Sequence, residues 1–272
     1  SINYYKVLDD LQFSFIVIGR GKQSSKSFHN MTGLKPFVGG LESFLKKDPK
    51  PCTHAIVSVG VEQLASITKQ LLRYGIQNIL VEKPSGLNKK EIESVSKLTK
   101  SKKANVLVAY NRRYYASTIK AKEIIEKDGG VKSFNCEFTE WAHEVEKLEK
   151  PSDVKENWLL ANSSHVVDLA FYLGGKPKQI STFVSGGLDW HPSGSIFAGA
   201  GISETKALFN YQANWESAGR WSVEILTKEH RLILKPLEKL RIQKKGSINN
   251  KFVEVIDYTL DKLFKPGLYN MT

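Results

Sequence analysis

Long apolar runs and cysteines are both scarce in this sequence. No apolar stretch approaches the roughly 20 residues that a membrane-spanning helix needs, so we expect no membrane association. The two cysteines, Cys52 and Cys136, are far apart and lack metal-ligand spacing. We therefore predict no metal site, and the scarcity of cysteine favours a reducing, cytoplasmic setting.

Acidic residues are fewer than basic ones, 28 against 40, which leaves a formal net charge of +12. A nucleic-acid-binding surface usually concentrates such charge in one stripe with interleaved aromatic residues. Here the lysines are scattered in pairs along the chain, at 46–47, 89–90, 102–103 and 244–245. The pattern predicts no nucleic-acid binding. Attraction of anionic small molecules, such as a phosphorylated cofactor and a phosphate-bearing substrate, accounts for the surplus.

The first 110 residues alternate between strand and helix patterns. Such alternation is typical of a parallel, doubly wound sheet, so we predict an α/β fold with a Rossmann-type NAD(P)-binding domain over residues 1–110. Strands are expected at 13–18, 35–38, 53–59, 76–81 and 104–110, the first of them buried, and helices at 2–11, 22–32, 41–47, 62–74 and 89–100.

The pattern changes after Tyr110. A long helix at 117–128 is followed mostly by strands, expected at 131–140, 178–185, 205–215, 222–227 and 231–235, with one further helix near 163–173. We predict that residues 111–272 form a second, α+β domain with a large, mostly antiparallel open sheet. This domain would bind the substrate and support oligomerisation.

A glycine-rich turn follows the first predicted strand, with Gly19, Arg20, Gly21, Lys22 and Ser24. It lacks the third glycine of a dinucleotide fingerprint and the Gly-Lys-Ser/Thr of a P-loop. It also lacks the acidic residue that bonds the ribose hydroxyl of NAD at the end of a second Rossmann strand. Arg20 and the neighbouring serines suit a 2′-phosphate instead, so NADP is the preferred cofactor and NAD the alternative. The simpler alternative is a turn with an exposed arginine.

The helix predicted at 2–11 precedes this strand, which makes the strand the second of a dinucleotide fold. We therefore expect the first strand and its phosphate-binding glycines to lie upstream of Ser1, in a chain truncated at its amino end. Ser1 would occupy the small-residue position at the start of the helix, beside the cofactor.

Glu82, Lys83 and Pro84 stand where the apolar run 76–81 ends. A lysine there emerges at the carboxyl edge of a parallel sheet, where open α/β folds bind ligands. The alternative is a surface strand that merely ends in a charged pair.

Three motifs together resemble the Gfo/Idh/MocA oxidoreductases, a family that includes glucose–fructose oxidoreductase and inositol 2-dehydrogenase. They are Glu82-Lys83-Pro84, then Ala109-Tyr110-Asn111-Arg112-Arg113-Tyr114, then Ser164-His165-Val166-Val167-Asp168-Leu169 with Leu173-Gly174-Gly175. The resemblance spans nearly the whole chain. It implies hydride transfer between a nicotinamide and a hydroxyl or keto carbon of a sugar or nucleotide sugar, in a homodimer or homotetramer. The stretch 187–192 is similar to members from surface-polysaccharide pathways.

The resemblance implies that Lys83 and His165 are catalytic and converge on the reacting hydroxyl. An imidazole titrates near neutrality and can take the proton, and an ammonium stabilises a developing alkoxide. Asp168 either fixes the tautomer of His165 or caps local structure. Ala161 stands where many members carry an acid, so Asn162 substitutes for it, or His165 works alone, or the chain is a non-catalytic binding or scaffold protein.

The remaining expected contacts follow strand ends and helix starts. Arg113 is as readily an ion-pair partner as a ligand contact, and aromatic residues in a sheet are more often core than sugar-binding. The predicted cofactor contacts are Ser1, Gly19, Arg20, Gly21, Lys22, Ser24, Ser58, Val59, Gly60, Glu82, Lys83 and Asn111. The predicted substrate contacts are Lys83, Arg112, Tyr114, Trp141, Asn157, Trp158, Asn162 and His165.

Overall fold

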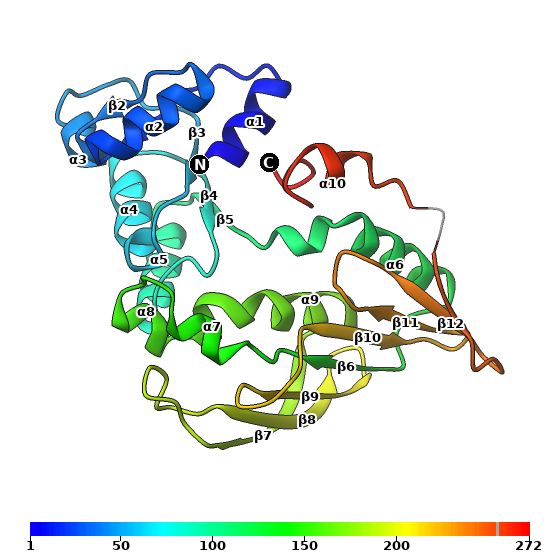
Figure 1. The fold of residues 1–272 in the computed structure, drawn as a ribbon. Coiled ribbons are helices and arrows are strands. Elements are labelled where there is room, and N and C mark those ends of the chain that lie inside the picture. Colours follow the sequence, from blue (N-terminus) through cyan, green and yellow to red (C-terminus); the bar gives the residue numbers. More distant parts are fainter. Residues whose placement is uncertain (254–255) are drawn as a thin grey trace. The chain divides into compact units, whose positions relative to one another are not determined.

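The computed structural model describes residues 1–253 and 256–272 (Figure 1). The chain divides into two compact units. Unit 1 comprises Ser1–Ala109 and Leu268–Thr272, and unit 2 comprises Tyr110–Gly267. The cofactor and substrate roles assigned to the two parts of the sequence stay predictions. None of the helices in the described ranges is long and apolar enough to cross a lipid bilayer.

Unit 1 alternates helices with parallel strands, as the sequence predicted. The strands form two sheets, β1-β2 and β3-β4-β5, and every strand pair in them is parallel. The elements are α1 (Ile2–Asp10), β1 (Ile18–Gly19), α2 (Lys22–Thr32), β2 (Phe37–Val38), α3 (Gly40–Leu45), β3 (His54–Val57), α4 (Val61–Tyr74), β4 (Asn78–Glu82), α5 (Lys89–Ser101) and β5 (Asn105–Ala109).

Local chemistry explains the ends of the unit 1 helices. Gly33 and Gly75 end α2 and α4 in the left-handed conformation, with φ of 74° and 107°, which glycine adopts without the Cβ penalty. At the start of α5, the side chain of Asn88 accepts from the amide of Glu91, and the carboxylate of Glu91 accepts from the amide of Leu87 at 2.7 Å. This reciprocal capping fixes the turn that follows β4.

The prediction of a buried strand over residues 13–18 is wrong. Only Ile18–Gly19 are paired as a strand, and Phe13 and Ile16 are 60% and 57% exposed. Within the described ranges β1 has one sheet neighbour, β2. An apolar β-branched run becomes a buried strand only where neighbouring strands and helices cover it, and that covering is not a local property.

Unit 2 contains one eight-stranded sheet with the order β13-β12-β11-β10-β6-β9-β8-β7. All neighbours are antiparallel except β6 and β9, which confirms the mostly antiparallel open sheet. The strands are β6 (Ser133–Glu137), β7 (Pro177–Ser185), β8 (Ile196–Ser203), β9 (Leu208–Asn214), β10 (Ser222–Leu226), β11 (His230–Leu234), β12 (Arg241–Lys244) and β13 (Asn250–Phe252).

Helix α9 (Ser164–Gly174) lies against one face of this sheet, at β6 and β10 (Figure 1). Phe171 of α9 meets Phe134 of β6 and Phe209 of β9 edge to face, with ring centroids 5.6 and 5.0 Å apart. The other helical segments are the 3₁₀ turn η1 (Asn111–Tyr114), α6 (Ala116–Lys127), α7 (Ala142–Glu146), α8 (Ser152–Glu156), the π-helical turn η2 (Leu159–Ser163) and α10 (Thr259–Leu263).

Strand β8 and helices α7 and α8 were not predicted, so the expectation of a single helix among the later strands is wrong. Glycines obscure β8 in the sequence. A Cβ atom on Gly199 would lie 2.5 Å from Cε1 of the Tyr211 ring. One on Gly201 would overlap the Gln179 carbonyl on β7 and lie 2.6 Å from Cζ of the Phe209 ring. Glycine weakens a strand pattern in the sequence, yet here it makes room for aromatic rings from β9.

Candidate active site

The carboxyl ends of the parallel strands in unit 1 gather several predicted cofactor residues. Because β3 and β4 run parallel in direct register, Ser58, Val59 and Gly60 after β3 lie at the same sheet edge as Glu82 and Lys83 at the end of β4. Gly60 is the N-cap of α4. This edge is where open α/β sheets bind ligands.

Helix α1 is tied to this edge by two polar contacts. The Tyr4 hydroxyl donates to Glu82 Oε1 at 3.0 Å, and the Ser1 amino group donates to Ser58 Oγ at 3.2 Å. Burial raises the pKa of the Tyr4 hydroxyl, and the neighbouring Glu82 carboxylate raises it further. Tyr4 therefore acts as a neutral donor that holds Glu82 in place.

The glycine-rich turn joins β1 to α2 as predicted. A Cβ atom on Gly19 would overlap the Ser25 hydroxyl, so any larger residue would require the Ser25 side chain to rotate. Gly21 is the N-cap of α2 and, as a glycine, supplies no side chain to cap the helix's first amides. Arg20 and Lys22 are exposed beside those amides. Free amides at a helix start together with two cations make an arrangement that suits a phosphate.

In unit 2, His165 lies in the first turn of α9, directly after the π-helical turn η2. Its side chain is buried, and its ring centroid is 6.1 Å from that of Tyr110 and 6.4 Å from that of Trp221. Burial raises the pKa of the Tyr110 hydroxyl. Single π-helical turns within helices occur frequently at functional sites, so this helix start is the candidate catalytic position of unit 2.

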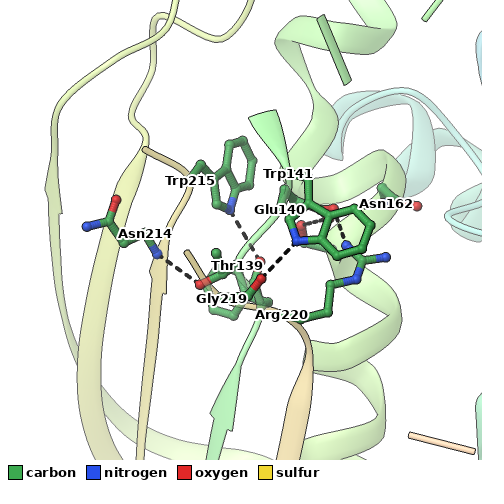
Figure 2. A network of polar contacts seen from close by, with 10 residues as sticks. Thr139, Glu140, Trp141, Asn162, Asn214, Trp215, Gly219 and Arg220 are labelled. Carbon is green, nitrogen blue, oxygen red and sulfur yellow. Dashed lines mark hydrogen bonds and ion pairs between the residues drawn. The ribbon is translucent and has the colours of Figure 1, made fainter. Parts of the chain in front are cut away.

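A buried carboxylate, Glu140, braces the segment that leads into α9 (Figure 2). Its Oε1 accepts from Asn162 Nδ2 at 3.0 Å and from Ser163 Oγ at 2.7 Å, and its Oε2 lies 3.4 Å from Arg220 Nη1. Glu140 is 2% exposed. Burial raises the pKa of its carboxyl, while the bonds from Ser163 and Asn162 and the charge of Arg220 oppose that rise.

Arginines and indole rings stack beside this carboxylate. The guanidinium carbon of Arg220 lies 4.7 Å from the centroid of Trp141 and 4.5 Å from that of Trp221. Arg112 approaches the same Trp221 ring at 4.8 Å. Trp141 Nε1 donates to the Gly219 carbonyl at 3.0 Å, which fixes the loop before β10 (Figure 2). The stacks hold both guanidinium groups near His165 through one shared ring.

Of the eight predicted substrate residues, Lys83 lies in unit 1, and the seven in unit 2 fall into two sets. Arg112, Trp141, Asn162 and His165 share the cluster around Glu140 and Trp221. The others lie elsewhere in unit 2: Tyr114 is half-exposed in η1, the Asn157 amide donates to the Asp153 carbonyl, and Trp158 is buried 6.4 Å from the Trp190 ring. The Asn111 amide, a predicted cofactor contact, donates to the Pro266 carbonyl at 2.9 Å.

Sequence reasoning missed Arg220 and Trp221, which complete the cluster. The sequence signal that could have identified them is a cation followed by an aromatic residue, directly before the predicted strand at 222–227. Asp168, for which two roles stayed open, has its carboxylate paired with Arg113. Of the two roles considered for Arg113, the structure shows the ion pair.

Comparison with known proteins found no matching family profile and no matching curated sequence. Solved structures do match. A dehydrogenase (MviM) from Clostridium difficile superposes with a TM-score of 0.75 at 21% identity, covering 98% of this chain and 83% of the other. Levoglucosan dehydrogenase in complex with NADH and levoglucosan gives 0.69 at 18% identity, covering 88% and 69%. UDP-N-acetylglucosamine 3-dehydrogenase GnnA from Acidithiobacillus ferrooxidans gives 0.65 at 11% identity, covering 88% and 74%.

At these identities the likeness establishes the fold. The chain has the fold of these dehydrogenases, with parallel sheets in its first part followed by a large, mostly antiparallel sheet, so the fold expected from the sequence is confirmed. Activity does not follow from fold alone; it has to be argued from the site.

Proposed function

We propose that this chain is an NAD(P)-dependent oxidoreductase of the Gfo/Idh/MocA family that transfers a hydride between nicotinamide and a carbinol or keto carbon of a sugar or nucleotide sugar. The observation that carries the proposal is the position of Lys83, directly after the carboxyl end of β4, in a fold shared with dehydrogenases solved with NADH. Neighbours of this fold include enzymes named for levoglucosan and for UDP-N-acetylglucosamine.

The residues of unit 1 fit a phosphorylated dinucleotide. The first amides of α2 lack side-chain caps, and Arg20 and Lys22 are exposed beside them. A guanidinium at this position can hold a 2′-phosphate through paired hydrogen bonds, which favours NADP over NAD. Ser58, Val59 and Gly60 at the end of β3, with Glu82 at the end of β4, would line the rest of the cofactor site.

Lys83 and His165 would act on the oxygen of the reacting carbon. During oxidation the hydroxyl proton passes to the imidazole of His165, and the ammonium of Lys83 stabilises the negative charge that develops on the oxygen. Nicotinamide, when bound, would supply the acceptor for the hydride that leaves the carbon. In the reverse direction His165 returns the proton to the oxygen. Asn162 and Glu140 would orient the sugar or the start of α9.

The open face of the eight-stranded sheet supports self-association. Phe183 and Leu208 are exposed large hydrophobic residues on the face opposite the Phe209 side chain. Exposed apolar side chains on the open face of a sheet favour association. We propose a homodimer or homotetramer formed through this face, acting in the cytoplasm and serving surface-polysaccharide synthesis.

A nicotinamide titration tests the proposal. We expect saturable NADPH binding, followed by the cofactor's fluorescence, that Arg20→Glu weakens by about tenfold or more because a charge-assisted contact is lost. Its effect on NADH should be smaller, since NADH lacks the 2′-phosphate. Arg73→Glu, an exposed charge reversal at the end of α4, is the matched control and should leave binding unchanged.

A scaffold protein of the same fold is the second candidate, favoured by the buried Ala161 where an acid is common. A measurement of turnover distinguishes the enzyme from the scaffold protein. With a sugar found by screening for NADP reduction, Lys83→Met and His165→Asn should each lower kcat by about 10²–10⁴-fold, and His165→Asn should retain NADPH affinity. Absence of saturable binding of either nicotinamide, or salt-sensitive binding of random DNA without a nicotinamide response, would overturn the enzyme proposal.

A further inference from the structure

We propose that Arg220 and Arg112, arranged around Trp221, form a subsite in unit 2 that binds an anionic group of the sugar substrate, a phosphate or a carboxylate. The inference deepens the proposed function and rests on it. It names the substrate class, a negatively charged sugar, and it assigns a specificity-determining role to Arg220, a residue outside the recognised motifs.

The guanidinium of Arg220 is held by its faces and leaves its edge available. Trp141 and Trp221 lie 4.7 and 4.5 Å from its central carbon. Among the described residues, its one recorded polar side-chain contact is the 3.4 Å approach of Nη1 to Glu140 Oε2. A guanidinium carries five N–H donors. The side chain is 44% exposed, so the remaining donors can meet a ligand from solution.

The local charge balance favours an added anion. Arg112 and Arg220 face the same ring and repel each other, and two carboxylates, Glu140 and Glu238, act on Arg112. Glu238 is exposed, so solvent screens its charge. Burial lowers the pKa of Arg112, and the neighbouring charge of Arg220 lowers it further. A phosphate or carboxylate bound between the two guanidinium groups would offset their repulsion.

Arg112 provides a second sign of incomplete pairing. In the described part of the chain, no hydrogen-bond partner reaches its buried Nε atom. Buried donors are normally satisfied, and the exceptions call for a ligand, a water molecule or an ion. Paired N–H donors in a planar fork match the geometry of carboxylate and phosphate oxygens.

The position of the cluster relates the anion to the reacting centre. Trp221 lies beside the His165 ring at 6.4 Å and beside Arg220 at 4.5 Å. An anionic group on Arg220 would therefore lie within the reach of one sugar whose hydroxyl meets His165. Indole rings also suit the apolar faces of that sugar. A neutral sugar would add no negative charge beside the two guanidinium groups, so the subsite discriminates by charge.

Binding of defined probes to the full chain tests the inference. The probes are glucose 1-phosphate, glucuronate and neutral glucose, measured by calorimetry with and without NADPH. We expect at least one anionic probe to bind about tenfold more tightly than glucose, with an affinity that falls as salt is raised. Phosphate-selective and carboxylate-selective binding distinguish the two sources of the anion.

Variants separate recognition from structural support. Arg220→Gln should abolish the preference for the anionic probe, and Arg220→Lys should retain part of it because the charge stays while the planar fork is lost. Lys244→Gln, an equal loss of charge on β12, should retain all of it. Thermal unfolding shows whether each variant is folded. If Arg220→Gln does not fold, the anion preference of Arg220→Lys is compared with that of the wild type instead.

Two outcomes overturn the inference: equal binding of glucose and both anionic probes by the wild type, or an anion preference that survives Arg220→Gln. The proposed function fails separately. If the wild type binds no nicotinamide but shows anion binding that depends on Arg220, only the oxidoreductase proposal is contradicted. If NADPH binds but neither anionic probe is preferred over glucose, only the proposed subsite is contradicted.

Discussion

Arg113 and Asp168 form a bidentate ion pair within unit 2. Arg113 Nε donates to Asp168 Oδ2 at 2.8 Å, and Nη2 donates to Oδ1. The guanidinium also packs 5.0 Å from the Tyr172 ring and 5.7 Å from the Tyr110 ring. Since Asp168 lies one helical turn after His165, the pair attaches η1 to the helix that carries the candidate catalytic histidine.

Asp168→Asn should destabilise the protein by about 1.5–3 kcal/mol, because it removes the charge from a hydrogen-bonded, largely buried carboxylate and leaves Arg113 uncompensated. Urea unfolding gives the free energy. Glu123→Gln, which breaks an exposed pair with Lys120 on α6, is the control and should change stability little. Equal losses of unfolding free energy in the two variants would show that the Arg113–Asp168 pair stabilises the protein no more than an exposed ion pair does.

Glu140→Gln should gain stability relative to the wild type as pH rises from about 4 to about 7. The pKa of Glu140 is raised in the folded state, so the folded protein holds this proton more tightly than the unfolded chain does. The wild type therefore loses stability as pH increases above the ordinary carboxyl pKa, and the amide has no such dependence. Urea unfolding of both proteins across this range measures the difference; a constant difference, or one moving the other way, would contradict it.

Gly174→Ala should destabilise unit 2 by about 1–3 kcal/mol through overpacking. A Cβ atom on Gly174 would lie 2.6 Å from Cζ of the Phe134 ring. Phe134→Leu in the same chain should recover part of that loss, because the smaller side chain makes room. A double-mutant cycle measures the coupling, and strictly additive effects would show that the two positions do not clash.

Tyr4→Phe should lower the free energy of unfolding by about 1 kcal/mol, because Glu82 loses the hydrogen bond that the Tyr4 hydroxyl donates. Thermal unfolding is the measurement. Tyr114→Phe is the matched control, since Tyr114 is half-exposed and no hydrogen bond of its hydroxyl is recorded in the described ranges. If Tyr4→Phe also weakens NADPH binding, Glu82 lies in the cofactor site as predicted. Unchanged stability would mean that water replaces the Tyr4 contact.

Local patterns predicted most of unit 1 well. Helix α4 shows apolar spacing that ends at Gly75, and β4 is an apolar run that leads into Glu82 and Lys83; both depend on neighbouring residues alone. The prediction of a buried strand at 13–18 was wrong because burial depends on which strands lie beside that segment. Strand β8 was not predicted because Gly199 and Gly201 weaken its strand pattern. The structure requires glycine there because the Tyr211 and Phe209 rings on β9 and the Gln179 carbonyl on β7 lie too close for a side chain.

Motif spacing identified Asn162 and His165, which are close in sequence, but it could not assemble the rest of the cluster. Arg220 meets Glu140 because β10 pairs with β6 in antiparallel register, which places the residues before one strand beside those after the other. Such register is set by non-local pairing and core packing.

The amino-acid sequence by itself determined the succession of helices and strands, the glycine turn before α2, and the lysine and histidine proposed for catalysis. Only the tertiary structure decided that Glu140 would be buried against Asn162 and Ser163, and that Arg112 and Arg220 would share one indole ring. The reason is physical: helix spacing and turn chemistry act over a few residues, whereas burial, charge compensation and stacking depend on which distant segments the sheet brings together.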